Sequence, residues 1–184
     1  MNPSLTLTYL RLGKIERADA LGYVAGQFVG GVAGVFLVRA AVGMAVAHPA
    51  VRFAVTAPGP SGMAVAFAAE VAISFLLMTV VLVASNRRGL APYTPLLCGV
   101  LVATYIALEA PMSGMSMNPA RSFASALAAH EWTALWIYFT APPLGMLAAA
   151  ETYVRLHGLH RVLCAKLNHA TARRCIFHCR YGDL

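Results

Sequence analysis

The sequence has few charged residues. Asp, Glu, Lys and Arg make up 11% of its 184 residues and hydrophobic residues make up 59%, whereas charged residues account for about a quarter of a soluble domain. This shortage excludes an ordinary soluble domain and indicates a protein that crosses the membrane several times. Acidic residues are fewer than basic ones, with 7 Asp and Glu against 14 Lys and Arg. The basic residues lie between and after the apolar stretches, where they set membrane topology, so they do not predict nucleic-acid binding.

The sequence also lacks a recognisable signal peptide and a recognisable set of catalytic residues. Met1 is followed directly by Asn2-Pro3, so we expect no signal peptide. No nucleophile, base and orienting group come together either: Ser113 and Ser116 have no histidine nearby, and Glu109 has no evident partner. We therefore do not expect an enzyme, catalytic residues or a cofactor.

Four apolar stretches have about the length that a bilayer requires, and they are expected at residues 20–43, 62–84, 92–109 and 132–154. In the first, a glycine at every fourth position from Gly22 to Gly34 predicts a helix face that another helix approaches closely. Gln27 in the same stretch needs a partner in the protein interior, because an amide that faces lipid is costly. The second stretch is interrupted by Glu70 alone.

A polar, glycine-containing turn leads into a much shorter apolar segment at residues 113–123. Asn118 is a favoured N-cap and Pro119 suits the first helical position, so about two helical turns should follow. Such a helix is too short to span a bilayer and would direct the positive end of its dipole, with Arg121 beside it, into the membrane. Residues 2–12 begin in the same way with Asn2-Pro3, although a frayed terminus is the alternative there.

Membrane topology follows from the basic C-terminal stretch, which should lie in the cytoplasm. Three spans then separate Asn2 from Asn118, so the two half-helices enter from opposite faces and can meet start to start. His48-Pro49 resembles the same motif, but only two spans separate it from Asn118. We interpret it as an external loop.

At this point a family resemblance becomes clear. Asn118-Pro-Ala-Arg-Ser-Phe, preceded by Ser113-Gly, is similar to the second signature of the aquaporin and glycerol-facilitator (major intrinsic protein) family, and Asn2-Pro-Ser looks like a variant of the first. The resemblance covers residues 2–157. It implies an all-α membrane protein with an aquaporin-like right-handed bundle, here incomplete, of four transmembrane helices and two re-entrant half-helices. The channel domain would be 1–157, and 158–184 a basic cytoplasmic tail.

The function implied by the resemblance is a passive channel through which water or small neutral solutes such as glycerol pass in single file. The protein would be a multi-pass homotetramer in the plasma (inner) membrane, with the lipid bilayer and the permeant as its partners. The pore and selectivity residues would be Asn118, Pro119, Ala120, Arg121, Asn2, Pro3, Ser4, Ile106 and Met115, with Glu70 and Gln27 as structural support of the pore loop.

The sequence departs from the family pattern in three respects. It begins inside the first signature, so we expect the first two helices of the family to be missing, through a start codon assigned too late or a gene fragment; a non-conducting fragment with only a structural or interaction role is therefore the alternative function. Ile106 stands near a constriction position where strict water channels usually carry histidine, which predicts a wider, more apolar constriction and leaves water and glycerol both open. Ser4 replaces an alanine.

The tail contains a group of potential metal ligands: Cys164, His169, Cys175, His178 and Cys179. Their spacing matches no common zinc finger, and adjacent histidine and cysteine at 178 and 179 are awkward for one tetrahedral site. We therefore expect a basic, membrane-proximal tail without metal.

Overall fold

The computed structural model describes residues 2–166 and 175–181, and His169 lies outside them. The described residues form helices and connecting turns without a β-strand. The helices are α1 (Pro3–Arg11), α2 (Arg17–Val42), α3 (Met63–Ser85), α4 (Thr94–Leu108), α5 (Ala110–Ser113), α6 (Pro119–Ala129) and α7 (Leu135–His157), with 3-10 turns at Gly43–Ala47, Arg52–Ala54, Ala91–Tyr93 and Leu159–Arg161.

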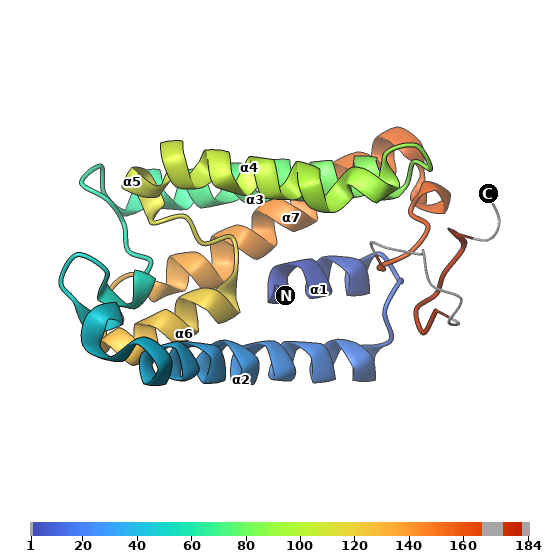
Figure 1. Cartoon of the computed structure of the whole chain (residues 1–184). Coiled ribbons are helices and arrows are strands. Elements are labelled where there is room, and N and C mark those ends of the chain that lie inside the picture. Colours follow the sequence, from blue (N-terminus) through green and yellow to red (C-terminus); the bar gives the residue numbers. More distant parts are fainter. Residues whose placement is uncertain (1, 167–174, 182–184) are drawn as a thin grey trace.

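The two short helices α1 and α6 lie between the long ones. Each begins in the middle of the molecule, and they run toward opposite ends (Figure 1). Helix α2 packs along α6, while α3 packs against both α7 and α4. This is the arrangement expected for two half-helices that enter a membrane from opposite faces, and all the predicted long helices are present with boundaries shifted by one to three residues.

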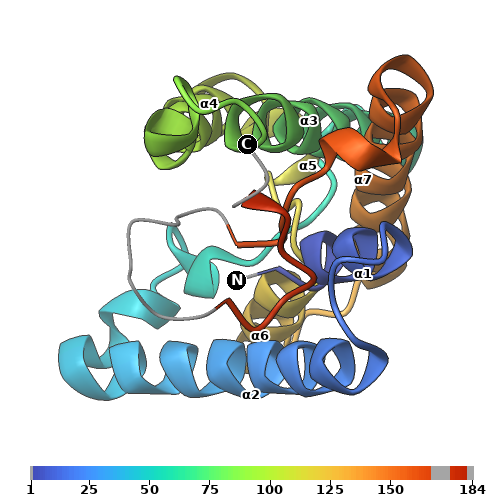
Figure 2. The same cartoon turned by 90° about the vertical axis from the view of Figure 1, so that its right-hand side faces the viewer.

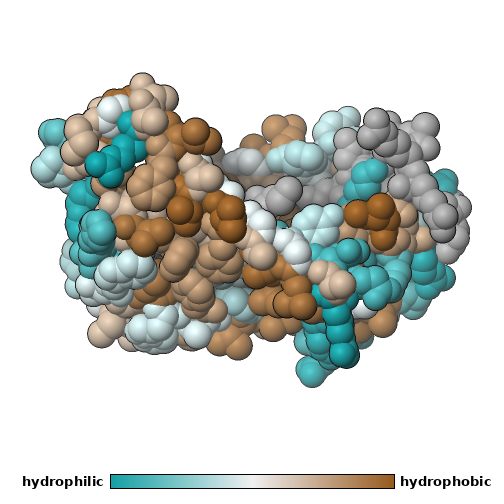
Figure 3. All heavy atoms as spheres, turned by 90° about the horizontal axis from the view of Figure 1, so that it is seen from below, coloured by the Kyte–Doolittle hydropathy of each residue, from teal (hydrophilic) through white to brown (hydrophobic). Residues whose placement is uncertain are grey.

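Three described helical stretches are long and apolar enough to cross a membrane: Arg17–Ala47, Met63–Ser85 and Ala91–Leu108. Helix α7, predicted as the fourth span, is 23 residues long, but Pro142, Pro143 and Glu151 lower its mean hydropathy, and it is not among them. On the face seen in Figure 3, hydrophobic residues cover the middle and hydrophilic residues gather toward the two ends. The molecule is an integral membrane protein by these features.

The closest helix pair is α3 and α7, where the two backbones touch. A Cβ atom added at Gly145 would lie 2.3 Å from the carbonyl oxygen of Val71 and 3.0 Å from the Cβ of Ser74. Small residues permit this approach because helix association within a membrane depends on van der Waals packing. Met146 and Met78, both fully buried, belong to the core beside this contact.

The expectation for the glycine stripe of α2 is wrong within the described residues. Nothing lies within 4 Å of a Cβ built at Gly22, Gly26, Gly30 or Gly34. Instead, their neighbour Gly31 makes the close approach, with a built Cβ 3.1 Å from the carbonyl oxygen of Ala120 in α6. The four-residue spacing identified a flat helix face, but the helix is rotated so that α6 packs beside that face.

Candidate functional site: the junction of two half-helices

Both half-helices begin with the same local structure. Asn2 has extended backbone angles, and its Oδ1 accepts a hydrogen bond of 2.9 Å from the backbone N–H of Ser4. Asn118 also has extended angles, and its Oδ1 accepts from the N–H groups of Ala120 at 3.1 Å and Arg121 at 3.4 Å. Each asparagine thus caps N–H groups that have no partner inside the helix. A proline follows each cap in the first helical position, where its missing N–H costs nothing.

The two helix starts are joined by a direct hydrogen bond. The Nδ2 of Asn2 donates to the carbonyl oxygen of Met117 over 2.6 Å. The bond links residues that are 115 positions apart in the sequence. Because Met117 immediately precedes Asn118, the bond brings the two capping asparagines close together. The positive ends of two helix dipoles consequently face the same small region.

Glu70 of α3 anchors the loop that leads into α6. Its side chain is fully buried, and its Oε1 accepts from the Ser113 hydroxyl at 2.9 Å and the Ser116 N–H at 2.6 Å. Its Oε2 accepts from the N–H of Met117 at 2.8 Å. These bonds satisfy donors that the loop could not pair within itself.

The loop backbone needs such support because it is strained. Gly114, Met115 and Met117 have φ angles of 79°, 47° and 55°. Positive φ is easy for glycine but uncommon for methionine, and each such residue costs about 1–3 kcal/mol. Hydrogen bonds from Met117 and Ser116 to Glu70 hold this conformation. They direct the carbonyl oxygen of Met117 toward Asn2.

A set of hydroxyl groups behind the loop was missed by sequence reasoning. The Ser122 Oγ lies 2.5 Å from the Ser116 Oγ and accepts from the Thr56 hydroxyl at 2.7 Å. The Tyr138 hydroxyl of α7 donates to the carbonyl oxygen of Ser113 over 2.6 Å. Thr56 lies in the proline-rich segment between α2 and α3, 66 residues before Ser122, and no local pattern links the two. The loop is therefore fixed from three sides.

Two cavities meet at Asn118 and Arg121. The first has a volume of about 540 Å³ and is lined by Asn2, Ile106, Met115, Asn118 and Arg121, with Leu77, Val102 and loop residues around them. The second, of about 790 Å³, lies between α2 and α6, and both Asn118 and Arg121 line it too. The buried Nη1 of Arg121 has no hydrogen-bond partner among the described residues. Its N–H groups are available to something that enters the cavities.

The remaining predicted residues occupy supporting positions. Gln27 lines the larger cavity, and its Nε2 donates to the Thr6 hydroxyl of α1 at 3.0 Å, which ties the two helices together. Ala120 lines that cavity as well. Pro3, Ser4 and Pro119 are buried in the helix starts and are not among the residues that line either cavity.

The chemistry of the junction is that of hydrogen-bond donors in an apolar wall. Neither cavity lining contains Asp, Glu, His or Cys among the described residues, so the linings offer no set of metal ligands and no acid or base. Arg121 contributes the one formal charge in these linings. Such a site can bind a small neutral molecule through its oxygen atoms.

Comparison with known proteins agrees with this geometry. The family model described as "Major intrinsic protein" matches residues 1–153. Aquaporin NIP3-1 of Oryza sativa subsp. japonica is 36% identical over 155 residues, which cover 83% of this chain and 48% of the relative. Aquaporin NIP6-1 of Arabidopsis thaliana is 34% identical over 154 residues, with the same coverage, and aquaporin NIP2-1 of Zea mays is 33% identical over 180 residues, 95% of this chain and 59% of the relative. The chain spans about half the length of the curated relatives it matches. By its sequence match, helical fold and paired Asn-Pro half-helices, the chain belongs to the major intrinsic protein family.

Proposed function

We propose that this chain forms the wall and constriction of a passive channel for water or small neutral solutes. The observation that carries the proposal is the junction itself: two asparagine-capped half-helices meet through the bond between Asn2 and Met117, beside a cavity that holds Asn2, Asn118 and Arg121. A permeant at this point meets amide and guanidinium donors on one side and apolar walls on the other. Passage needs binding that is favourable enough to enter and weak enough to leave, and a few hydrogen bonds to a neutral molecule meet that condition.

Electrostatics at the junction disfavour cations. The starts of α1 and α6 both present the positive ends of their dipoles, and Arg121 adds a full positive charge nearby. The described residues that line the cavities provide no carboxylate to offset it. Protons and metal cations are therefore repelled where neutral molecules pass.

The apolar side of the smaller cavity favours solutes larger than water. Ile106, Val102 and Leu77 lie there with Met115, so one wall offers contact surface for a carbon skeleton while Arg121 supplies donors. We infer a preference for small polyhydroxyl or similarly neutral molecules, with water as a further permeant. The aquaporin names of the relatives support the inference that water is a permeant.

The assembly and orientation that go with this function are a homotetramer in the plasma membrane with the C-terminus in the cytoplasm. The basic residues after α7 support this orientation, because positive charge is enriched on the cytoplasmic side. Crosslinking of protein in native membranes, and protease access from each side of sealed vesicles, test the two points.

The deciding experiment is stopped-flow swelling and shrinking of proteoliposomes under water and glycerol gradients. We expect rates above those of protein-free vesicles, and a loss of about tenfold in glycerol flux when Arg121 is replaced by Leu, which removes a donor worth about 1.4 kcal/mol to a bound solute. Arg39→Ala is the matched control, because Arg39 lies exposed in the last turn of α2 and lines neither cavity.

A non-conducting structural role is the second candidate, and one observation favours it. The larger cavity is bordered by Gly26, Gly30 and Gly34, and nothing in the described chain lies within 4 Å of a Cβ built on them. A pore wall left open on this side would not conduct. Proteoliposomes that contain folded chain, shown by its helical circular dichroism, and yet swell no faster than empty vesicles would support this second role and overturn the first.

A further inference from the structure

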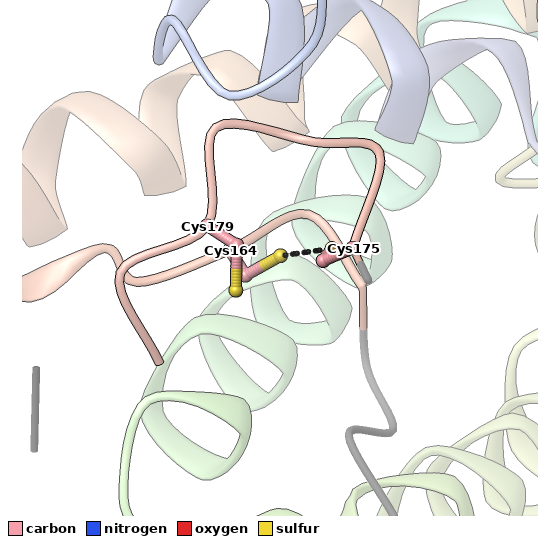
Figure 4. Close-up of side chains that lie close together, drawn as sticks. All are labelled: Cys164, Cys175 and Cys179. Carbon is pink, nitrogen blue, oxygen red and sulfur yellow. Dashed lines mark hydrogen bonds between the residues drawn. The ribbon is translucent and has the colours of Figure 1, made fainter. Parts of the chain in front are cut away.

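Three cysteines far from the half-helix junction come together at the end of the chain. Cys164 follows the 3-10 turn after α7, and Cys175 and Cys179 lie beyond residues 167–174. Their Sγ atoms all lie within 4.8 Å of one another, and those of Cys164 and Cys175 are 3.5 Å apart (Figure 4). The sequence shows these cysteines as potential ligands, but their spacing matches no common zinc finger and does not predict that they lie together.

The spacing of the sulfur atoms is that of a metal-thiolate site. With Zn–S bonds of about 2.3 Å in tetrahedral geometry, bound sulfur atoms lie about 3.8 Å apart. In the cluster one pair of sulfur atoms is 3.5 Å apart and no pair is more than 4.8 Å apart, so the spacing is compatible with three sulfur atoms around one ion. The histidine nearest in sequence is occupied elsewhere: the ring nitrogens of His178 face the Gly13 carbonyl oxygen at 2.9 Å and the Glu16 Oε1 at 2.6 Å.

The position of the cluster is fixed by the fold. Cys164 is 2% exposed, and Val162 and Leu163 before it are buried in the core. Asn86, at the end of α3, accepts from the Leu163 N–H at 2.7 Å, and the Arg180 backbone N–H donates to the Leu163 carbonyl oxygen at 2.9 Å. The segment with Cys179 is thereby held against the segment with Cys164. A site that is already assembled loses little conformational entropy when an ion binds.

A backbone donor and two lysine side chains also lie near the sulfur atoms. The backbone N–H of Lys166 donates to the Cys164 Sγ over 3.3 Å, and a hydrogen bond of this kind stabilises a charged sulfur. Lys166 acts electrostatically on Cys175, and Lys14, which is buried, does so on Cys164 and Cys179. Three thiolates and a divalent ion carry a net charge of −1, which these lysines offset.

We propose that Cys164, Cys175 and Cys179 bind one thiophilic divalent ion of the zinc class, through three thiolates, with the fourth position left to water. Binding forms three metal–sulfur bonds and releases one proton from each thiol, without oxidation or reduction. This proposal departs from the sequence analysis, which predicts a tail without metal. Cysteine and histidine patterns in sequence detect compact fingers, and this site is assembled by tertiary packing instead.

The ion would fasten the tail across one end of the helix bundle. Beside the cluster, the His178 N–H donates to the Lys14 carbonyl oxygen at 3.4 Å, and Phe177 packs on Tyr23 of α2 with ring centroids 6.1 Å apart. Figure 2 shows residues 175–181 crossing this end, where α1 ends and α2 begins. A bound ion therefore links the tail, the turn at Gly13 and the end of α7 into one unit.

The test is a titration of the purified full chain, kept reduced in detergent, with Cd²⁺ alone, followed by the ultraviolet thiolate-to-cadmium absorption band. We expect one ion per chain, and affinity at least about tenfold lower when Cys164, Cys175 or Cys179 is replaced by Ser. Cys98→Ser is the matched control, because Cys98 lies in α4, outside the cluster. Control-like affinity in the Cys164→Ser, Cys175→Ser, Cys179→Ser triple variant would overturn the proposal.

A second measurement needs no substitution and so does not depend on how the variants fold. The unmodified chain is alkylated with iodoacetamide with and without Zn²⁺, and the labelled cysteines are identified by mass spectrometry. We expect Zn²⁺ to protect the three clustered thiols together and to leave the labelling of Cys98 unchanged. Equal labelling in both conditions, or a disulfide that persists under reduction and excludes the ion, would refute the site.

Discussion

The two half-helices begin with the same sequence motif but are held in place by different kinds of contact. Both α1 and α6 begin with an asparagine cap followed by proline. The loop before α6 is fixed by buried polar groups, with Glu70, Tyr138 and Ser122 pairing its donors and acceptors. Helix α1 is fixed largely by apolar packing of side chains such as Tyr9, with Gln27 as its polar tie to α2.

The difference shows which feature needs which kind of support. An asparagine cap specifies where a helix begins, whatever surrounds it. A loop with Met115 and Met117 at positive φ has no intrinsic preference for its shape, so buried hydrogen bonds must select it. We therefore expect the loss of a buried polar group that holds this loop to cost more than the loss of an exposed polar group that holds α1.

The largest effect is expected from Glu70→Gln. The amide keeps the size of the carboxylate. However, its NH₂ group would face one of the backbone N–H groups that now donate to Glu70, so a buried donor would lose its acceptor. We expect the free energy of unfolding to fall by about 2–4 kcal/mol. Chemical denaturation in detergent, followed by circular dichroism, measures the change.

The matched control is Glu151→Gln. Glu151 forms an exposed ion pair with Arg11 at 2.8 Å, where it holds the far end of α1 to α7. Its replacement should cost less than about 1 kcal/mol, because exposed ion pairs contribute little. Equal losses of stability in the two variants would contradict the expected difference between a buried polar anchor and an exposed ion pair.

The cap of α1 offers an intermediate effect, in which the cap can be separated from the bond between the two half-helices. Asn2→Ala removes a cap, worth about 1 kcal/mol, and also the donor to Met117, for a loss of about 2 kcal/mol. Serine keeps the capping oxygen. Asn2→Ser should therefore recover only the part of this loss that belongs to the cap, in the same unfolding measurement. Full recovery in Asn2→Ser would show that the bond between Asn2 and Met117 contributes nothing.

The smallest effect is expected just beyond the C-terminal end of α6. The pKa of Glu131 is held below its ordinary value of 4.5 by hydrogen bonds from Thr133, with a smaller contribution from Arg52 at 3.2 Å. A lowered carboxyl pKa stabilises the fold above the unfolded value and loses this contribution as pH falls below it. Melting temperatures of wild type and Arg52→Gln should thus differ slightly at pH 7 and converge below pH 4. A difference that persists at low pH would contradict this assignment.

Local features could be predicted from sequence because their causes are local. Asn-Pro at positions 2 and 118 places both helix starts correctly, since cap and first turn involve neighbouring residues. Helix α5 was not predicted, because its four residues carry no periodic pattern. Hydropathy also found the long helices, although α7, with two prolines and Glu151, is less apolar than the others.

Features that depend on tertiary packing could not be predicted. The partnership of Thr56 with Ser122 spans 66 residues, and the rotation of α2 that selects Gly31 over the regular glycine stripe depends on the shape of α6. The three cysteines were visible in the sequence, but only the fold shows that their sulfur atoms lie close together. In each case the sequence shows a residue type suited to a role, and the fold decides which residue fills it.

Gly145 shows how a defect far from the half-helix junction could resemble a defect in permeation. Because its missing side chain lets α7 touch the carbonyl oxygen of Val71, even alanine would wedge the two helices apart. The resulting phenotype would be low abundance, since cells degrade destabilised protein, while each surviving molecule kept its junction unchanged. Genetic surveys that score only growth or uptake would then place Gly145 among the residues of the proposed channel, and protein levels would have to be measured to separate the two effects.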